Sequence, residues 1–272
     1  MNNPKTGRWA LWLSFPLAVL LVIASGAGVF LPSVYANEPH LAGAGAVSAD
    51  LMNLIVVVPV LIASAIFTLR GWMGARLVWM STVLYVVYAF IYYTLSVRYN
   101  ALFLIYCAVQ GLSFYMLVGA LGSISVGEIA RRYRRRGPAF AAAVLLLVIV
   151  AGASVHWAQR AIAVVQSGKA PQDVLDAGQI TDVAAVLDLA FVLPAFALTA
   201  VLLLMRRPMG FVLGPIILSF TGMIALLLVA IVAVLVDRGL AADYSGIAVS
   251  GGIAVIAGAL LALFLRPVPK EA

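Results

Sequence analysis

Residues 50–64 read DLMNLIVVVPVLIAS, and residues 185–199 read AVLDLAFVLPAFALT. Each stretch is an apolar run with a polar group near one end and a proline near its middle. Five pairs of residues correspond when the two stretches are aligned without gaps: Asn53 with Asp188, Leu54 with Leu189, Val57 with Val192, Pro59 with Pro194, and Ser64 with Thr199. Ionisable groups and prolines are costly inside a helix that crosses hydrocarbon, so their presence is informative. Two such helices in corresponding halves of a chain predict a site between them.

The overall composition indicates the class of protein. Of the 272 residues, 65% are hydrophobic and only 10% are charged, whereas a soluble domain carries about 25% charged residues. The apolar runs are continuous for about 20 residues, which is the length of a membrane-spanning helix. A transmembrane β-barrel would instead alternate apolar and polar residues in runs of about ten. The sequence therefore predicts an all-α membrane protein.

Eight apolar runs are long enough to cross a bilayer, so we expect a bundle of eight transmembrane helices in one domain, residues 1–272. The expected spans are 9–31, 47–69, 77–97, 101–124, 139–159, 181–205, 211–236 and 245–265. The first run follows a basic head and resembles a secretory signal. Because it is longer than the roughly 7–15 apolar residues of a signal, we interpret it as a retained helix. Pro171, followed by two acids, predicts a short interfacial helix.

The distribution of lysine and arginine predicts the orientation of the chain. With the N-terminus inside, the inner segments hold 13 basic residues and the outer segments hold four. This bias favours a protein of the bacterial cytoplasmic (inner) membrane with both termini cytoplasmic. The net charge of +7 is then a topology signal and not a nucleic-acid site. The strongest basic run should anchor the topology and attract anionic lipid headgroups. It comprises Arg131, Arg132, Arg134, Arg135 and Arg136.

The two matching stretches also suggest an internal repeat. If they are equivalent, the chain consists of two four-span halves, residues 1–130 and 138–272, joined by the polyarginine loop. An even number of spans in each half would keep the halves parallel, related by an axis along the membrane normal. The alternative is that two helices rich in valine, leucine and alanine align by chance.

Polar residues within or beside the spans are the candidates for a binding site. Asp188 lies about 10 Å into the sixth span, where a charge facing lipid would be costly, so it should face the bundle interior. Its alternative role is a hydrogen bond that holds helices together, and the alternative role of Asp50 is a helix cap. The candidate ligand-binding set on the outer side of the bundle is Asp188, Asp50, Asn53, Asn100, Tyr92, Tyr106 and Gln110.

Metal and catalytic motifs are weak or absent. His40, His156 and Glu38 are weak candidates for a metal site, although zinc sites usually need at least three protein ligands. The alternative is that both histidines lie at the membrane interface. The sequence contains no glycine-rich phosphate loop and no catalytic triad spacing. We therefore expect no cofactor, and an enzyme is the less favoured class.

Four segments together resemble a known family. They are ADLMNL at 49–54, LYVVYAFIYY at 84–93, RYNALFLIY at 98–106 and VLDLAFVLPA at 186–195. The chain is similar over most of its length to an uncharacterised family of prokaryotic eight-span integral membrane proteins. This resemblance implies the same topology and a site that includes Asp50, Asn100 and Asp188. The family has no assigned activity, so the resemblance implies no function.

Three functions are compatible with these patterns. The first is a membrane protein that binds or transports a small polar or cationic solute, or protons, through an outward-facing polar cavity. The second is an accessory or scaffold subunit of a larger membrane complex, or a homo-oligomer, whose polar residues only hold helices together. The third, and least favoured, is an intramembrane enzyme. The lipid bilayer is the partner common to all three.

Overall fold

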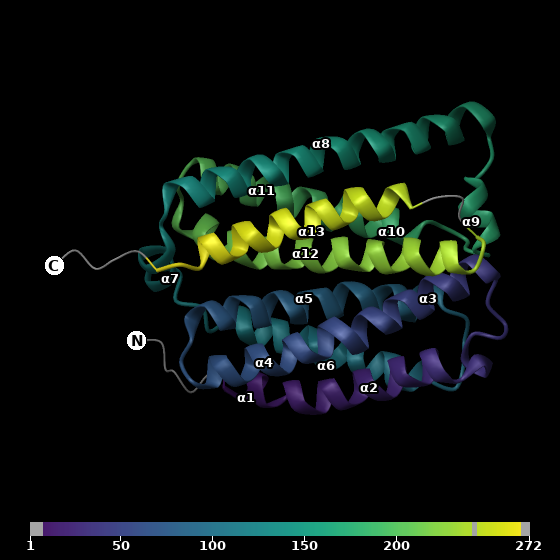
Figure 1. The fold of residues 1–272 in the computed structure, drawn as a ribbon, viewed down its shortest axis with the longest axis horizontal. Coiled ribbons are helices and arrows are strands. Elements are labelled where there is room, and N and C mark those ends of the chain that lie inside the picture. Colours follow the sequence, from purple (N-terminus) through teal and green to yellow (C-terminus); the bar gives the residue numbers. More distant parts are fainter. Residues whose placement is uncertain (1–7, 241–243, 268–272) are drawn as a thin grey trace.

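A computed structural model describes residues 8–240 and 244–267 of the chain (Figure 1). In these residues all regular structure is helical, and eight helices are long and apolar enough to cross a membrane. The spans are Arg8–Phe30 (α1, Arg8–Trp12, and α2, Ser14–Phe30), His40–Leu69 (α3, His40–Met52; η2, Asn53–Val57; α4, Val58–Leu69), α5 (Met73–Ser96), α6 (Phe103–Leu121), α8 (Arg136–Ser167), Val183–Leu204 (α10, Val183–Leu187; η3, Asp188–Val192; α11, Leu193–Leu204), α12 (Pro208–Asp237) and α13 (Ser245–Phe264). The short helices are η1 (Pro32–Val34), α7 (Val126–Tyr133) and α9 (Gln172–Asp176).

The prediction of eight spans is confirmed, and so is the short helix after Pro171. The second and fifth spans differ most from the expected ones, and both are longer. The second begins at His40, seven residues before the expected start, because the alanine and glycine residues of this segment form a helix despite their modest hydropathy. The fifth continues to Ser167 and ends at Gly168, whose positive φ of 64° is typical of a helix C-terminus.

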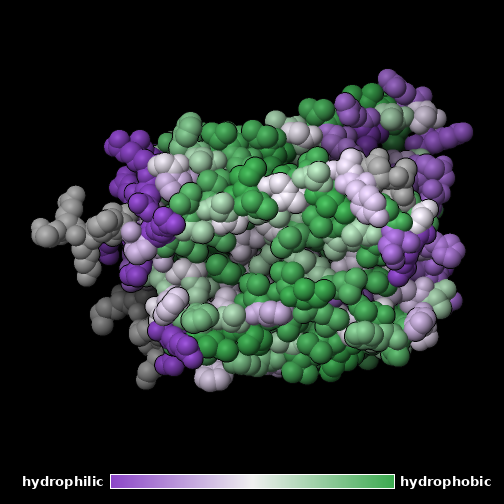
Figure 2. Space-filling model, in the orientation of Figure 1, coloured by the Kyte–Doolittle hydropathy of each residue, from purple (hydrophilic) through white to green (hydrophobic). Residues whose placement is uncertain are grey.

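The surface of the bundle has the distribution of polarity that a bilayer requires. Figure 2 shows a broad hydrophobic band around the middle of the molecule and hydrophilic residues at both ends. Large apolar side chains of the spans, such as Phe140, Val148 and Val255, are exposed. In a soluble protein such a surface would be costly, whereas lipid tails solvate it. The chain therefore has the form of a multi-pass membrane protein.

The spans pack as two groups of four helices. In the first group, α2 and α5 each contact α4 and α6. In the second group, α8 and α12 each contact α11 and α13. Helix α12 also contacts α5 and α3, and these contacts join the two groups (Figure 1). A buried cluster of apolar side chains runs through both groups and includes Trp79, Phe90 and Phe211.

The turns after α4 and α11 have the same backbone structure. Trp72 N–H donates to Phe67 O at 3.0 Å, and Arg207 N–H donates to Leu202 O at 2.9 Å. These six-residue closures are characteristic of the Schellman motif, which requires a residue with positive φ. Gly71 supplies it in the first turn with a φ of 89°. In the second turn the corresponding residue is Arg206, with a φ of 56°.

The polyarginine segment is partly helical, which the sequence analysis did not anticipate. Helix α7 is amphipathic and packs against α12 through its apolar side, which buries Ile129 and Tyr133. Arg131 and Arg132 occupy its last turn, where positive charge interacts favourably with the helix dipole. Helix α7 and the turns after α4 and α11 lie at one end of the bundle, which we call the basic end (Figure 1).

Candidate functional site

Both stretches that opened the sequence analysis contain a π-helical turn at the same register. The turns are η2 and η3, and they begin at Asn53 and Asp188. In each case the next helix carries proline as its second residue, Pro59 in α4 and Pro194 in α11. Proline lacks an N–H and its ring clashes with the carbonyl four residues earlier, so the preceding turn widens. Such π-helical turns occur frequently at functional sites.

A buried carboxyl group is the centre of the first candidate site. Asp50 of α3 is 1% exposed. The hydroxyl of Tyr35 donates to its Oδ2 atom at 2.6 Å, and the hydroxyl of Tyr93 donates to its Oδ1 atom at 2.8 Å. Gly28 of α2 lies directly against the carboxyl group, and a Cβ atom at this position would overlap Oδ2. The sequence therefore brings two tyrosines and a glycine from separate segments around one acid.

Asn53 extends this site by one helical turn. Its Nδ2 atom donates to Ser25 Oγ at 3.1 Å, and the side chain is fully buried. Among the described residues, its Oδ1 atom has no hydrogen-bond partner within bonding distance, and neither does the buried hydroxyl of Tyr106. The ring centroid of Tyr106 lies 5.3 Å from that of Tyr93. Unpaired buried acceptors are uncommon in folded proteins. In the described part of the chain, two such groups therefore belong to the surroundings of Asp50.

The Asp50 carboxyl group has no basic partner. In the described part of the chain, the only ion pairs are those of Arg160 with Asp173 and Asp182. The pKa of the Tyr35 phenol is raised above its ordinary value, mainly by burial and to a lesser extent by the nearby charge of Asp50. The Tyr35 hydroxyl therefore stays neutral and remains a hydrogen-bond donor. A carboxyl group that is buried in a membrane span without a cation is a favourable acceptor for a proton or a small cation.

A cavity of about 230 Å³ opens at the end of the bundle opposite the basic end. Tyr35 and Gly28 form part of its wall, and they also contact Asp50. The remaining charged or titratable residues in the wall are Glu38, His40 and Arg238. We call this space the outer cavity. Tyr35 and Gly28 thus connect the wall of the outer cavity to the acid.

Asp188 forms a separate contact on the other side of α5. Its Oδ1 atom accepts a hydrogen bond from the Tyr88 hydroxyl at 3.3 Å, and the residue is half-buried. Tyr88 and Tyr93 are five residues apart on α5, which places them about 140° apart around the helix. Helix α5 therefore presents one tyrosine to Asp50 and another to Asp188. The structure does not bring the two acids into contact.

Comparisons of the chain with protein-family models, with curated proteins and with solved structures found no match. The resemblance to a family of eight-span membrane proteins therefore stays a prediction. Function has to be inferred from the geometry of the two acids, of their tyrosine partners and of the outer cavity.

The other predicted site residues have local partners. Tyr92 accepts a hydrogen bond from Gln179 Nε2, and Asn100 Oδ1 accepts one from Leu102 N–H at 2.9 Å. The Nδ2 atom of Asn100 and the Oε1 atom of Gln110 are buried and have no hydrogen-bond partner in residues 8–240 and 244–267. We find no hydrogen bond from Tyr92, Asn100 or Gln110 to either acid among the described residues.

The weak candidates for a metal site do not form one cluster. Glu38 and His40 both line the outer cavity, and Glu38 Oε1 accepts a hydrogen bond from Arg98 N–H at 2.6 Å. His156 lies instead on α8, where its ring contacts that of Trp157. No group of three or more His, Cys, Asp or Glu side chains in residues 8–240 and 244–267 could hold a metal ion.

Sequence reasoning missed the groups that complete the site. The candidate set did not include Tyr35, Tyr93, Ser25 or Gly28. Tyr93 is only 2% exposed. One signal was available: a glycine in an apolar span indicates a close approach of another group. What that group is depends on contacts between segments that are distant along the chain.

Proposed function

We propose that the protein binds and transports protons or a small cationic solute, which enters through the outer cavity and reaches Asp50. The single observation that carries this proposal is a fully buried carboxyl group that has two tyrosine donors, no basic partner and a cavity next to it. An acid of this kind inside a membrane span is a functional-site hypothesis by default.

The contacts suggest how the ligand would be held. A proton would neutralise the Asp50 carboxylate, while a cation would replace the tyrosine hydrogen bonds with direct coordination. The free Oδ1 atom of Asn53 and the hydroxyl of Tyr106 would supply further oxygen ligands. Tyr35 lines the cavity and also donates to the acid, so rotation of its side chain would open the path. Asp188 and Tyr88 would form a second acceptor across α5.

Three details of topology belong to the same proposal. The excess of basic residues at the basic end supports a cytoplasmic location for that end, and therefore an inner-membrane protein with both termini cytoplasmic. The outer cavity would then face the periplasm. The matching π-helical turns, the matching Schellman turns and the similar packing of the two groups support two parallel four-span repeats.

The test is transport by the purified protein in lipid vesicles. Collapse of an imposed pH gradient, and separately of Na⁺ and K⁺ gradients, is followed with internal fluorescent indicators. Asp50→Asn should reduce the rate to that of protein-free vesicles, because an amide neither takes up a proton nor neutralises a cation. Its cost in stability should be only about 1 kcal/mol, since the amide still accepts a hydrogen bond. Asp188→Asn should also slow the collapse.

Asp237→Asn is the matched control. Asp237 is exposed at the outer end of α12, so the substitution removes the same charge without touching the buried site. The control should transport like the wild type. If Asp50→Asn also keeps the wild-type rate, the proposal is wrong. An intact-complex mass that shows a second polypeptide in stoichiometric amount would instead favour an accessory subunit.

A further inference from the structure

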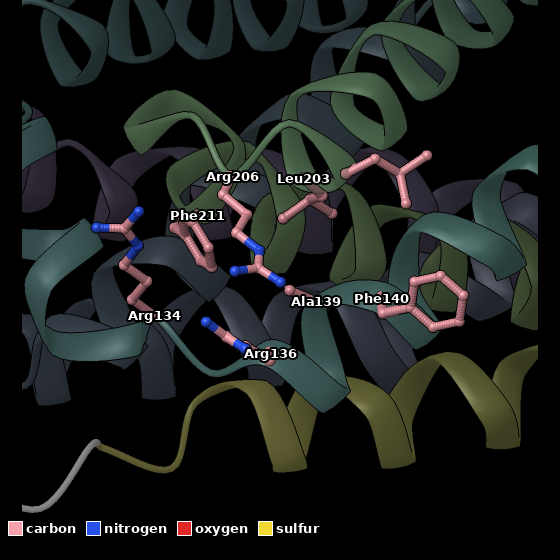
Figure 3. Close-up of a pocket in the computed structure, with 8 residues that line it drawn as sticks. Arg134, Arg136, Ala139, Phe140, Leu203, Arg206 and Phe211 are labelled. Atoms are coloured by element: carbon pink, nitrogen blue, oxygen red, sulfur yellow. The ribbon is translucent and has the colours of Figure 1, made fainter.

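A cavity of about 280 Å³ lies at the basic end, between the start of α8 and the turn that joins α11 to α12. Arg134, Arg136 and Arg206 contribute three cationic side chains to its wall. Apolar residues complete it, and they are Ala139, Phe140, Leu203, Leu204 and Phe211. In Figure 3 the guanidinium group of Arg206 extends from its turn toward Arg136, while that of Arg134 lies to one side. We call this space the arginine cavity.

Among the residues that the structure describes, the three guanidinium groups have no anionic partner. All the ion pairs within the described ranges belong to Arg160, which lies on α8 near the opposite end of the bundle. Positive charges gathered in one place repel one another unless an anion neutralises them. Guanidinium groups bind phosphate with paired hydrogen bonds, and arginine is the residue that proteins favour for this purpose. The arginine cavity therefore has the charge and the donors of a phosphate site.

The backbone at Arg206 provides a second, independent observation. Arg206 is the one residue other than glycine with a positive φ in the described ranges. The corresponding turn after α4 uses Gly71, which adopts this conformation without strain. Arginine adopts it only at a cost, and strained residues of this kind cluster at functional sites. Its presence is explained if the guanidinium group is needed in the cavity.

We infer that the arginine cavity binds the phosphate of an anionic membrane lipid. The apolar part of the wall decides between lipid and free phosphate, because Phe140 is 63% exposed and Leu204 is 45% exposed. Both side chains are apolar and belong to membrane spans, so acyl chains can pack against them. A lipid would therefore place its phosphate among the arginines and its tails against Phe140 and Leu204, whereas free phosphate would use only the arginines.

Native mass spectrometry of the full-length protein in detergent tests this site. Phosphatidylglycerol is titrated in one series and inorganic phosphate in another. Arg206→Gly is the main variant, because glycine suits the backbone conformation of this turn and the protein should fold at least as well. It should weaken the binding of the first phosphatidylglycerol molecule about tenfold, the loss expected for one charge-assisted contact. Arg136→Gln should have a similar effect.

Arg207→Gln is the matched control, because Arg207 is exposed next to Arg206 but does not line the cavity. This variant should bind phosphatidylglycerol like the wild type. If Arg207→Gln and Arg206→Gly weaken the binding of phosphatidylglycerol equally, the lipid is attracted by the positive charge of the whole basic end, and the arginine cavity is not a specific site. If inorganic phosphate binds the wild type as strongly as the lipid and competes with it, the assignment to a lipid is overturned.

Discussion

Replacing Gly28 with alanine is expected to disrupt the Asp50 site and to destabilise the protein. The added methyl group would overlap Asp50 Oδ2 and would lie 2.8 Å from the Tyr35 hydroxyl oxygen. The carboxyl group would have to move and lose at least one of its two hydrogen bonds while remaining buried. Overpacking and an unpaired buried group together cost about 3 kcal/mol. The free energy of unfolding in detergent should fall by this amount, and transport should be lost.

The expected cause can be isolated with a double-mutant cycle. Asp50→Ala removes the carboxyl group that the new methyl group would overlap. The Tyr35 hydroxyl oxygen stays, but it is the end of a side chain that can shift once the carboxyl group is gone. In that background Gly28→Ala should cost little, so the two substitutions should show a coupling energy of about 2 kcal/mol. The cycle is measured by thermal unfolding of the four proteins. Equal costs of Gly28→Ala in both backgrounds would show that residue 28 does not contact the acid.

The number and order of the spans could be predicted because hydrocarbon sets a length and a polarity that each crossing segment has to match. The same reasoning failed for segments that hydrocarbon does not constrain in length and polarity. Helix α7 lies at the surface within an arginine run, and its only signal is the spacing of Ile129 and Tyr133 on one side of a helix. The start of α3 was missed because alanine and glycine are too weakly apolar to distinguish a span from a loop.

The candidate site was predictable as a set of acids but not as a set of contacts. Asp50, Asn53 and Asp188 were identified because polar groups are rare in spans. Tyr35 and Tyr93 meet Asp50 from 15 and 43 residues away in the sequence, and no local pattern encodes this meeting. The π-helical turns depend on how the chain relaxes before a proline, which a pattern of residue types does not specify.

The second large effect is expected at Gly210, near the start of α12. A Cβ atom at this position would lie 2.7 Å from the carbonyl carbon of Leu202 and 2.8 Å from the backbone nitrogen of Leu203. Both atoms belong to the backbone of α11, so no side-chain rotation relieves the clash. Gly210→Ala should force α11 and α12 apart and lower the free energy of unfolding by about 3 kcal/mol, measured by thermal unfolding in detergent.

Gly222 provides the matched control for Gly210 because it lies on the same helix. A Cβ atom at Gly222 would meet only the Cβ atom of Ala257, at 4.0 Å, which is an ordinary contact. Alanine is a better helix former than glycine, so Gly222→Ala should stabilise the protein by up to about 1 kcal/mol. The same substitution is thus expected to lower the free energy of unfolding at Gly210 and to raise it at Gly222. Equal changes in the free energy of unfolding at both positions would contradict the close approach of α11 and α12. This close approach also holds the Arg206 turn in place beside the arginine cavity.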